Sequence, residues 1–339
     1  MSYSSLPFAF RRAGPEDRGR ILALSSLFPN DWIPHALDDM LAEERGGFYV
    51  AELGGRLVAV CAAAGRGETA WLQAMRVHPD FQGRGVATAL TAYILDECKR
   101  LGYRSARLFT AVTNDPVHRL IRGKLGFRAR GRFVIADGIR DLRPFRQAPD
   151  LSRVRVGRPA DLEDAWALCE RAVREGAIDP PGLAAPPGDP WRVDDFTRET
   201  LAGHLEAGRM LVSERKARAR PGQAGAEGAT DTRAARGLDG FVLWHRLAGR
   251  PQEPEDQGDG GASATVFYLE ATGETVASLL AAAVAAIQSG GTVTEMALSL
   301  PRSQWEKLMR VVRPGWPPAG PSEEVVVYEK NLTAGGDRP

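Results

Sequence analysis

The chain has 339 residues, of which 43% are hydrophobic, so it is long enough for about two domains with separate cores. Its 44 basic and 43 acidic residues leave a net charge of +1, which indicates neither a nucleic acid nor an anionic membrane as a partner. Cys61, Cys98 and Cys169 are too few and too scattered for a disulfide framework or a zinc site, so we expect no metal. The N-terminus lacks the pattern of a signal peptide, and the longest apolar run, residues 279–287, is too short to span a bilayer. These features predict a soluble cytoplasmic protein.

The first half of the chain alternates between strand-like and helix-like patterns. Gly54 and Gly55 separate two apolar runs and are typical of a hairpin turn, and Gly102 is placed to end a long helix. The expected elements are strands at 8–12, 48–53, 56–64, 71–77, 105–111 and 127–138, and helices at 21–27, 86–102 and 115–126. This order predicts an α/β domain with a mixed sheet.

The second half repeats features of the first. Three pairs of residues share one offset: Arg11 and Arg155, Pro15 and Pro159, and Asp17 and Asp161. This indicates an internal duplication, with tandem domains at 1–147 and 148–339 joined by a polar, proline-bearing stretch.

Two inserts interrupt the second copy. Residues near 216–236 and 248–263 are rich in Gly, Pro, Ala and charge, and we expect mobile loops there.

The segment VHPDFQGRGVATAL, residues 77–90, places Gly83 and Gly85 where a strand gives way to a helix. The first amides of a helix have no internal partner and carry the positive end of its dipole. Glycines allow positive φ and a close approach of the backbone, so this loop is suited to an anion such as phosphate. The alternative is an ordinary helix entry with a flexible lead. The second copy has no such loop, so we expect it to have lost the ligand.

Two ordered motifs resemble the signatures of the GNAT superfamily of acyl-CoA-dependent N-acetyltransferases. Gln82, Gly85 and Ala87 match Q/R-x-x-G-x-G/A after a strand that ends in V-x-P, and Asn114 followed by residues 124–127 matches the second signature. The resemblance covers about the first 145 residues. It implies a GNAT fold, with a catalytic first domain and a degenerate second domain.

The resemblance implies acetyl-CoA as the co-substrate, with no metal. Backbone amides of the loop would hold the pyrophosphate, and the strand before it would pair with the pantetheine arm and polarise the thioester carbonyl. The cofactor-binding residues implied are Met75, Arg76, Val77, Gln82, Gly83, Arg84, Gly85, Val86, Ala87 and Asn114.

The catalytic groups depart from the family pattern. Strict alternation places Trp71, Gln73, Met75 and Val77 on one face, with Gln73 where many members have a catalytic Glu, and Gln cannot take a proton. The position of the usual Tyr acid falls on Ile121 or Arg122. The candidates are therefore Gln73, Glu68, His118 and Asn114, with Tyr103 and Asp115 as further possibilities. Each has a structural alternative: Glu68 a solvated turn, His118 a helix-surface residue, Tyr103 a packing residue and Asp115 a helix cap.

The acceptor is the least determined part of the reaction. The string L-x-x-M-R-V-H-P at 72–79 is weakly similar to amino-acid N-acetyltransferases of the histidine-acetylating kind. Arg76 could hold a substrate carboxylate, or it could face away from Gln73 and pair with an acid. We expect a small-molecule amine, an amino acid among the options, in a pocket enclosed by the second domain. The alternatives are a peptide or lysine acetyltransferase and a non-catalytic acyl-CoA sensor. The second domain would shape that pocket or form a homodimer interface.

Overall fold

A computed structural model describes residues 8–146, 150–176, 182–215, 237–247, 262–271, 274–290, 293–311 and 322–333. Nearly all of the two inserts expected near 216–236 and 248–263 lies outside these residues. None of the described helices is long and apolar enough to cross a membrane.

The described chain forms two compact units. The first comprises the chain up to Arg130 together with the residues from Val326 onward, and the second runs from Gly131 to Val325. These limits differ from the boundary at 147/148 expected from the sequence. The sequence boundary was set by local composition, whereas the C-terminal residues join the first unit through pairing with a strand that is distant along the chain.

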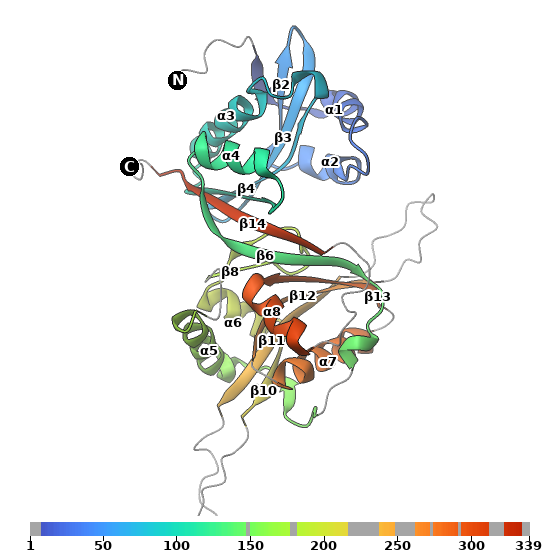
Figure 1. Cartoon of the computed structure of the whole chain (residues 1–339), viewed down its shortest axis with the longest axis vertical. Coiled ribbons are helices and arrows are strands. Elements are labelled where there is room, and N and C mark those ends of the chain that lie inside the picture. The colour runs from blue at the N-terminus through green and yellow to red at the C-terminus, as the bar shows by residue number, and fades with distance from the viewer. Residues whose placement is uncertain are drawn as a thin grey trace, which may run out of the picture. The chain divides into compact units, whose positions relative to one another are not determined.

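The first unit contains a mixed sheet with helices on both faces. Its elements are β1 (Ala9–Arg12), α1 (Arg18–Ser25), α2 (Ile33–Leu41), β2 (Gly47–Leu53), β3 (Arg56–Arg66), β4 (Thr69–Val77), α3 (Val86–Arg100), β5 (Ser105–Ala111), α4 (Asp115–Gly123), the start of β6 (Arg128–Ile139) and the end of β14 (Ser322–Asn331). The strands follow the order β1-β2-β3-β4-β5-β14. Helices α3 and α4 cover one face, and α1 and α2 cover the other (Figure 1).

The structure confirms the hairpin turn and the helix end that glycines predict in the sequence. β2 and β3 form an antiparallel hairpin in which Leu53 lies opposite Arg56, and both turn glycines have positive φ, 57° and 79°. Gly102 follows the end of α3 with φ of 85°, as a C-terminal stop requires. Helix α2 was not expected from the sequence.

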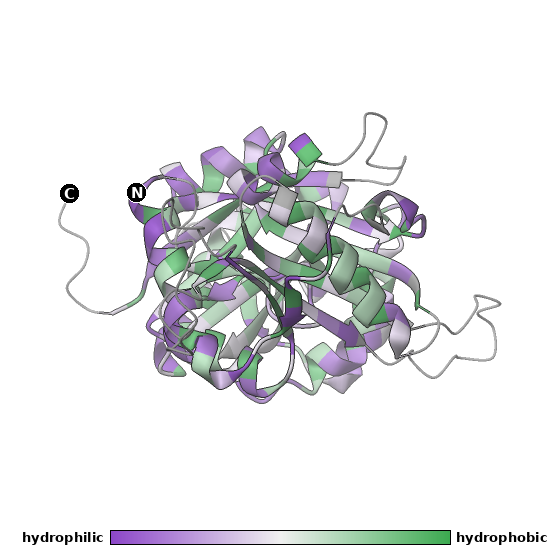
Figure 2. Ribbon diagram, turned by 90° about the horizontal axis from the view of Figure 1, so that it is seen from below, coloured by the Kyte–Doolittle hydropathy of each residue, from purple (hydrophilic) through white to green (hydrophobic). Residues whose placement is uncertain are grey.

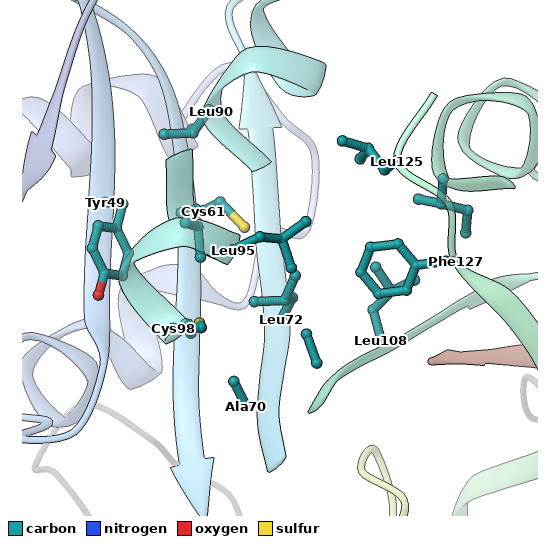
Figure 3. Packing of buried hydrophobic residues seen from close by; sticks show 14 of the residues in the cluster. Tyr49, Cys61, Ala70, Leu72, Leu90, Leu95, Cys98, Leu108, Leu125 and Phe127 are labelled. Atoms are coloured by element: carbon teal, nitrogen blue, oxygen red, sulfur yellow. The ribbon is translucent and has the colours of Figure 1, made fainter. Parts of the chain in front are cut away.

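The core on the α3 face joins residues from both ends of the chain. Leu90, Leu95 and Cys98 of α3 lie over strand residues such as Tyr49 and Leu72 (Figure 3). Tyr328 and Leu332 of the C-terminal segment belong to the same cluster, and Val326 packs against it. Hydrophobic residues concentrate on the strands and the inner sides of the helices, while polar residues gather on the outer helix surfaces (Figure 2). The first unit therefore depends on β14 for its core.

The second unit has the same layered arrangement. Its elements are the rest of β6, β7 (Val154–Val156), α5 (Leu162–Arg174), β8 (Leu183–Ala184), β9 (Asp194–Asp195), α6 (Arg198–Glu206), β10 (Met210–Glu214), β11 (Leu238–Leu247), β12 (Ala262–Ala271), α7 (Glu274–Ser289), β13 (Val293–Pro301), α8 (Arg302–Val311) and the start of β14. The main strands follow the order β6-β13-β12-β11-β10-β7. Helix α7 packs on one face, and α5 and α6 pack on the other.

The offset residues of the proposed duplication form the same ion pair in each unit. Arg11 donates two hydrogen bonds to the Asp17 carboxylate, at 2.6 and 2.8 Å, and also contacts Glu52. Arg155 does the same with Asp161, at 2.7 and 2.8 Å. Each aspartate also accepts a hydrogen bond from a backbone amide in the turn before its helix. The residues that share this offset thus form the same structural element, an Arg–Asp ion pair, in both units.

The carboxylates of these pairs make stability depend on pH. Hydrogen bonds from Arg11 hold the pKa of Asp17 at about 2, and those from Arg155 lower the pKa of Asp161. A group whose pKa is lower in the folded state stabilises the fold above its unfolded-state pKa, and this contribution is lost as pH falls through the folded-state value. We therefore expect the urea midpoint to drop as pH falls from about 4 to 2.

The variant Asp17→Asn tests this expectation. It should lose roughly 2 kcal/mol of unfolding free energy at pH 6, because the buried amide cannot pair with Arg11 as the carboxylate does. Its stability should then fall less steeply than that of the wild type between pH 4 and 2. The exposed control Asp96→Asn should follow the wild type, and an equal slope in Asp17→Asn would contradict the assignment.

Candidate active site at the start of helix α3

The glycine loop builds a cradle of backbone amides. β4 ends at Val77, a short turn follows at Pro79–Phe81, and α3 begins at Val86. Gly83 and Gly85 have φ of 72° and 82°, in the left-handed region. Gly85 is the N-cap of α3 and has no side chain to bond the first amides of the helix. No side chain caps these amides, and they lie at the positive end of the helix dipole, which suits an anion.

Side chains of the loop hold it in shape. The Gln82 amide nitrogen donates to the carbonyl oxygen of Val77 at 3.1 Å, which ties the loop to the end of β4. The Arg84 guanidinium lies 5.4 Å from the ring centre of Phe81 and is exposed. Gln82 is therefore engaged within the loop, while Arg84 is the cation available to an anion in the cradle.

β4 separates from β5 ahead of this loop. The two strands pair in parallel only over Thr69, Ala70 and Trp71, opposite Ser105, Ala106 and Arg107. Beyond Trp71 the edge of β4 on this side leaves the ladder. Unpaired strand edges present N–H and C=O groups that an extended ligand can bind.

A bulge at Ala74 changes the faces of β4. Ala74 has φ of 59°, and the register moves from Ala62 opposite Gln73 to Val60 opposite Arg76, so that one residue of β3 faces two of β4. Residues on both sides of a cross-strand pair share a face. Because Ala62 and Val60 lie in the cluster under α1 and α2, Gln73 and Arg76 share that face.

The alternation expected from the sequence is therefore wrong beyond Gln73. Met75 and Val77 pack with Leu72 against the α3 cluster, on the face opposite Gln73. Sequence periodicity assumes a regular pleat, and the bulge breaks it.

Arg76 forms an ion pair with the buried carboxylate of Asp31. Its guanidinium bonds both carboxylate oxygens of Asp31, at 2.7 and 3.2 Å, and the Asp31 side chain is only 3% exposed. Burial would raise the pKa of Asp31, but hydrogen bonds from Arg76 and Ser25 outweigh it and lower that pKa. The expected role of Arg76 as a free anchor for a substrate carboxylate is not supported, since its charge is already neutralised.

Asn114 and His118 lie where β5 meets α4. Asn114 is the N-cap of α4 and donates to the Thr110 hydroxyl at 3.0 Å. The Nε2 atom of His118 lies 3.0 Å from the Ala111 carbonyl oxygen, so it carries the proton, and Nδ1 accepts from the Tyr328 hydroxyl at 2.9 Å. This bonding links α4 to β5 and to the C-terminal strand.

The other candidates lie apart from this gap. Glu68 is an exposed turn residue just before the start of β4, where β4 and β5 are still paired, and it forms an ion pair with Arg104. Ile121 is buried in the α3-side core, and Arg122 lines a surface hollow beside His118. The Tyr103 hydroxyl donates to the carbonyl oxygen of Arg45. Asp115 is exposed at the first turn of α4.

The structure thus brings Gln73, Met75, Val77 and the glycine loop together on β4 and its connection to α3. Asn114 lies at the end of the neighbouring strand. Sequence reasoning missed Asp31 and Tyr328, because their partners are 45 and 210 residues away and no local pattern marks them. Among the residues described, no group of three or more His, Cys, Asp or Glu side chains could hold a metal ion.

Comparisons with known proteins identify the fold around this site. Residues 21–127 match the model of the acetyltransferase (GNAT) family, so this part of the first unit is a GNAT domain. No curated protein matches the chain in sequence. A GCN5-related N-acetyltransferase from Sphaerobacter thermophilus shares the fold with 16% identity and a TM-score of 0.52, over 98% of each chain.

Two other solved structures each cover a little over a third of the chain. The ribosomal-protein-S18-alanine N-acetyltransferase from Escherichia coli has 19% identity and a TM-score of 0.35, over 37% of this chain and 80% of that one. An N-acetyltransferase from Thermoplasma acidophilum in complex with coenzyme A has 14% identity and a TM-score of 0.32, over 37% of this chain and 91% of that one.

The bond between Tyr328 and His118 should contribute measurably to stability. Tyr328→Phe removes the hydroxyl and leaves the His118 Nδ1 acceptor unpaired, so we expect a loss of about 1–2 kcal/mol in unfolding free energy. The control is Tyr93→Phe, since the Tyr93 hydroxyl bonds no residue that the structure describes. Urea unfolding at pH 7.5 measures both, and equal stabilities for the two variants would show that the bond contributes nothing.

Proposed function

We propose that the first unit binds acetyl-CoA and transfers its acetyl group to the primary amine of a small metabolite. The observation that carries the proposal is the separation of β4 from β5 after Trp71, directly ahead of the amide cradle at the start of α3. A cradle alone suits any phosphate. A cradle next to an open strand edge suits a long ligand that has phosphates at one end and an amide-bearing arm at the other.

The two ends of coenzyme A fit two parts of this site. The pyrophosphate would accept hydrogen bonds from the backbone amides of residues Gly83 to Ala87, and Arg84 would be the nearby cation. The pantetheine arm contains two amide groups, which would pair with the backbone of β4 near Met75 and Val77 as an added strand does. A backbone amide at the bulge would then polarise the thioester carbonyl.

The acceptor would approach from the face opposite coenzyme A. The cradle and α3 lie on one face of the sheet, and Gln73 lies on the other, under α1 and α2. No described residue hydrogen-bonds the Gln73 side chain, so its amide oxygen is open to accept a hydrogen bond from the amine or from a water molecule.

The chemistry would be direct transfer. The amine nitrogen attacks the carbonyl carbon, a C–N bond forms, the C–S bond breaks and the thiolate of coenzyme A leaves. Gln73 cannot take the proton that the amine loses, so water would carry it away. A thiol intermediate is disfavoured, because burial raises the pKa of Cys61, Cys98 and Cys169 to about 12.

The charges on the acceptor face argue against an acidic acceptor. Arg76 is paired with Asp31, and the carboxylates of Asp39 and Glu43 line a hollow of about 160 Å³ between α2 and β3 on the same face. A substrate carboxylate would meet these like charges. We therefore propose an amine acceptor that has no carboxylate of its own.

The second unit differs from the first at the place where its own parallel strands part. β12 pairs with β13 only from Ala262 to Val266 and then parts from it, with a register shift in its pairing with β11. There the amide of Leu269 donates to Oε1 of Gln304, a fully buried residue of α8, at 3.0 Å. The Gln304 side chain thus accepts the hydrogen bond that the Leu269 amide would otherwise donate to a ligand. This supports binding of one coenzyme A per chain.

The decisive experiment is a turnover screen. The full chain is incubated with acetyl-CoA and a panel of amino acids, polyamines, arylalkyl amines and short peptides, with thiol release and product mass as readouts. We expect acetylation of a small amine. Acetylation of peptides alone would favour a peptide acetyltransferase, and coenzyme A binding without any acetylation would favour a sensor, which the Gln at position 73 would also fit.

Coenzyme A binding should depend on Gly85. Calorimetry should give one site per chain, and Gly85→Val should weaken binding at least about tenfold, because a branched side chain at positive φ blocks the cradle. The matched control is Gly102→Val at the other end of α3, where φ is 85° and an added side chain meets open space. Two sites per chain, or equal affinities for the two variants, would contradict the proposal.

A further inference from the structure

Helix α4 and the start of β6 border a hollow that three arginines line. The hollow has a volume of about 680 Å³, and its lining includes the exposed residues Arg119 and Arg122 of α4 and Arg128 of β6, beside His118. None of the three arginines forms an ion pair or a hydrogen bond with a residue that the structure describes. Asp115, the acid in the first turn of α4, forms no ion pair with a described residue either. The hollow therefore carries three positive charges without a partner in the described part of the chain.

Other arginines of the neighbouring strands have carboxylate partners. Arg107 of β5 and Arg130 of β6 both form ion pairs with Glu329 of β14. Like charges that lie close together repel each other, so a fold that gathers them without a counter-charge loses stability. Because this compensation is present only two residues from Arg128, three unpaired arginines in one hollow indicate a ligand rather than a structural role.

The second unit has a hollow at the matching helix, but its charges are balanced. Helix α8 follows β13 as α4 follows β5, and the hollow beside it measures about 460 Å³. Two arginines and two carboxylates line this hollow: Arg302, Arg310, Glu306 and Glu324. Arg302 bonds Glu306 at 2.9 Å and also bonds Glu324. The chain thus supplies the counter-charges in the second unit and leaves them out in the first.

The arginine-lined hollow is separate from the amide cradle and from the open edge of β4. The strands follow the order β4-β5-β14-β6, so the start of β6 lies two strand spacings, or roughly 10 Å, beyond β5 on the side away from β4. His118 lies toward the same side, since it bonds Tyr328 of β14. A ligand in the hollow would therefore not compete for the gap between β4 and β5.

The size and charge of the hollow favour a compact anion. A guanidinium presents a fork of N–H groups that matches two oxygens of a phosphate group. A volume of about 680 Å³ suits a small molecule. A nucleic acid or an acidic protein would need positive charge over a longer surface, yet Glu329 neutralises Arg107 and Arg130 alongside, and the net charge of the chain is only +1.

We infer that Arg119, Arg122 and Arg128 form an anion site for a small molecule with phosphate groups, in addition to the proposed coenzyme A site. The inference does not depend on the proposed function, because none of these residues belongs to the cradle or to the open edge of β4. The 3′-phosphate of coenzyme A shares the same chemistry, so the experiment distinguishes it from a free ligand.

Inorganic pyrophosphate is the probe, titrated by calorimetry into the full chain after saturation with coenzyme A, which fills the cradle. We expect one pyrophosphate site per chain. Arg119→Gln, Arg122→Gln and Arg128→Gln should each weaken it at least about tenfold, because each removes a charge-assisted hydrogen bond. The three residues are exposed and unpaired, so these variants should fold as the wild type does. The control Lys124→Gln removes an equal charge from an exposed residue that does not line the hollow, and it should weaken binding less than about twofold.

Coenzyme A and dephospho-coenzyme A separate the two sources of phosphate. Arg122→Gln should leave the affinity for both unchanged, and a loss confined to coenzyme A would assign the hollow to its 3′-phosphate and overturn the separate site. Equal weakening of pyrophosphate by Arg122→Gln and Lys124→Gln, or no binding of pyrophosphate to the wild type, would overturn it as well. If the chain binds no coenzyme A, the proposed function fails, and the same titration of the free chain still tests the arginine-lined hollow.

Discussion

The separation of β4 from β5 after Trp71 is the constraint on which the rest of the first unit depends. A continuous ladder would consume the amides of β4 and leave no edge for a ligand. The bulge at Ala74 acts with this separation, because it turns Gln73 and Arg76 toward α1 and α2 while Met75 and Val77 stay toward α3. Under the proposed function, one strand would serve a phosphate-bearing ligand on one side and a second reactant on the other.

The parts of the fold that the sequence predicts well are those that one residue determines locally. Positive φ at Gly54, Gly55 and Gly102 is a property of glycine, and the hairpin and the helix end follow from it. The cradle at Gly83 and Gly85 is equally local. The same reasoning fails at Ala74, because alanine carries no signal for a left-handed conformation and the bulge is imposed by the pairing of β4 with β3.

Partners that are distant in sequence explain the other differences. Nothing near Arg76 indicates Asp31, and the sequence left open whether Arg76 was free or paired. Nothing near residue 147 indicates that Tyr328 and Leu332 complete the first core, so composition alone placed the boundary where the chain is polar. Helix α2 has a clear apolar face, yet Pro34 and the two acids of its sequence obscure it in a local reading.

If the second unit binds no coenzyme A, as we propose, the two units explain why a structural motif can persist where a binding site does not. The pairs Arg11–Asp17 and Arg155–Asp161 each bury a carboxylate that would be costly to leave without its arginine, so substitution at either position would destabilise its unit. A backbone amide that would otherwise bind a ligand is not costly to keep when an internal group accepts its hydrogen bond. Gln304 supplies that group at Leu269, and the second unit therefore keeps its parted strands and its core while the amide is satisfied from within.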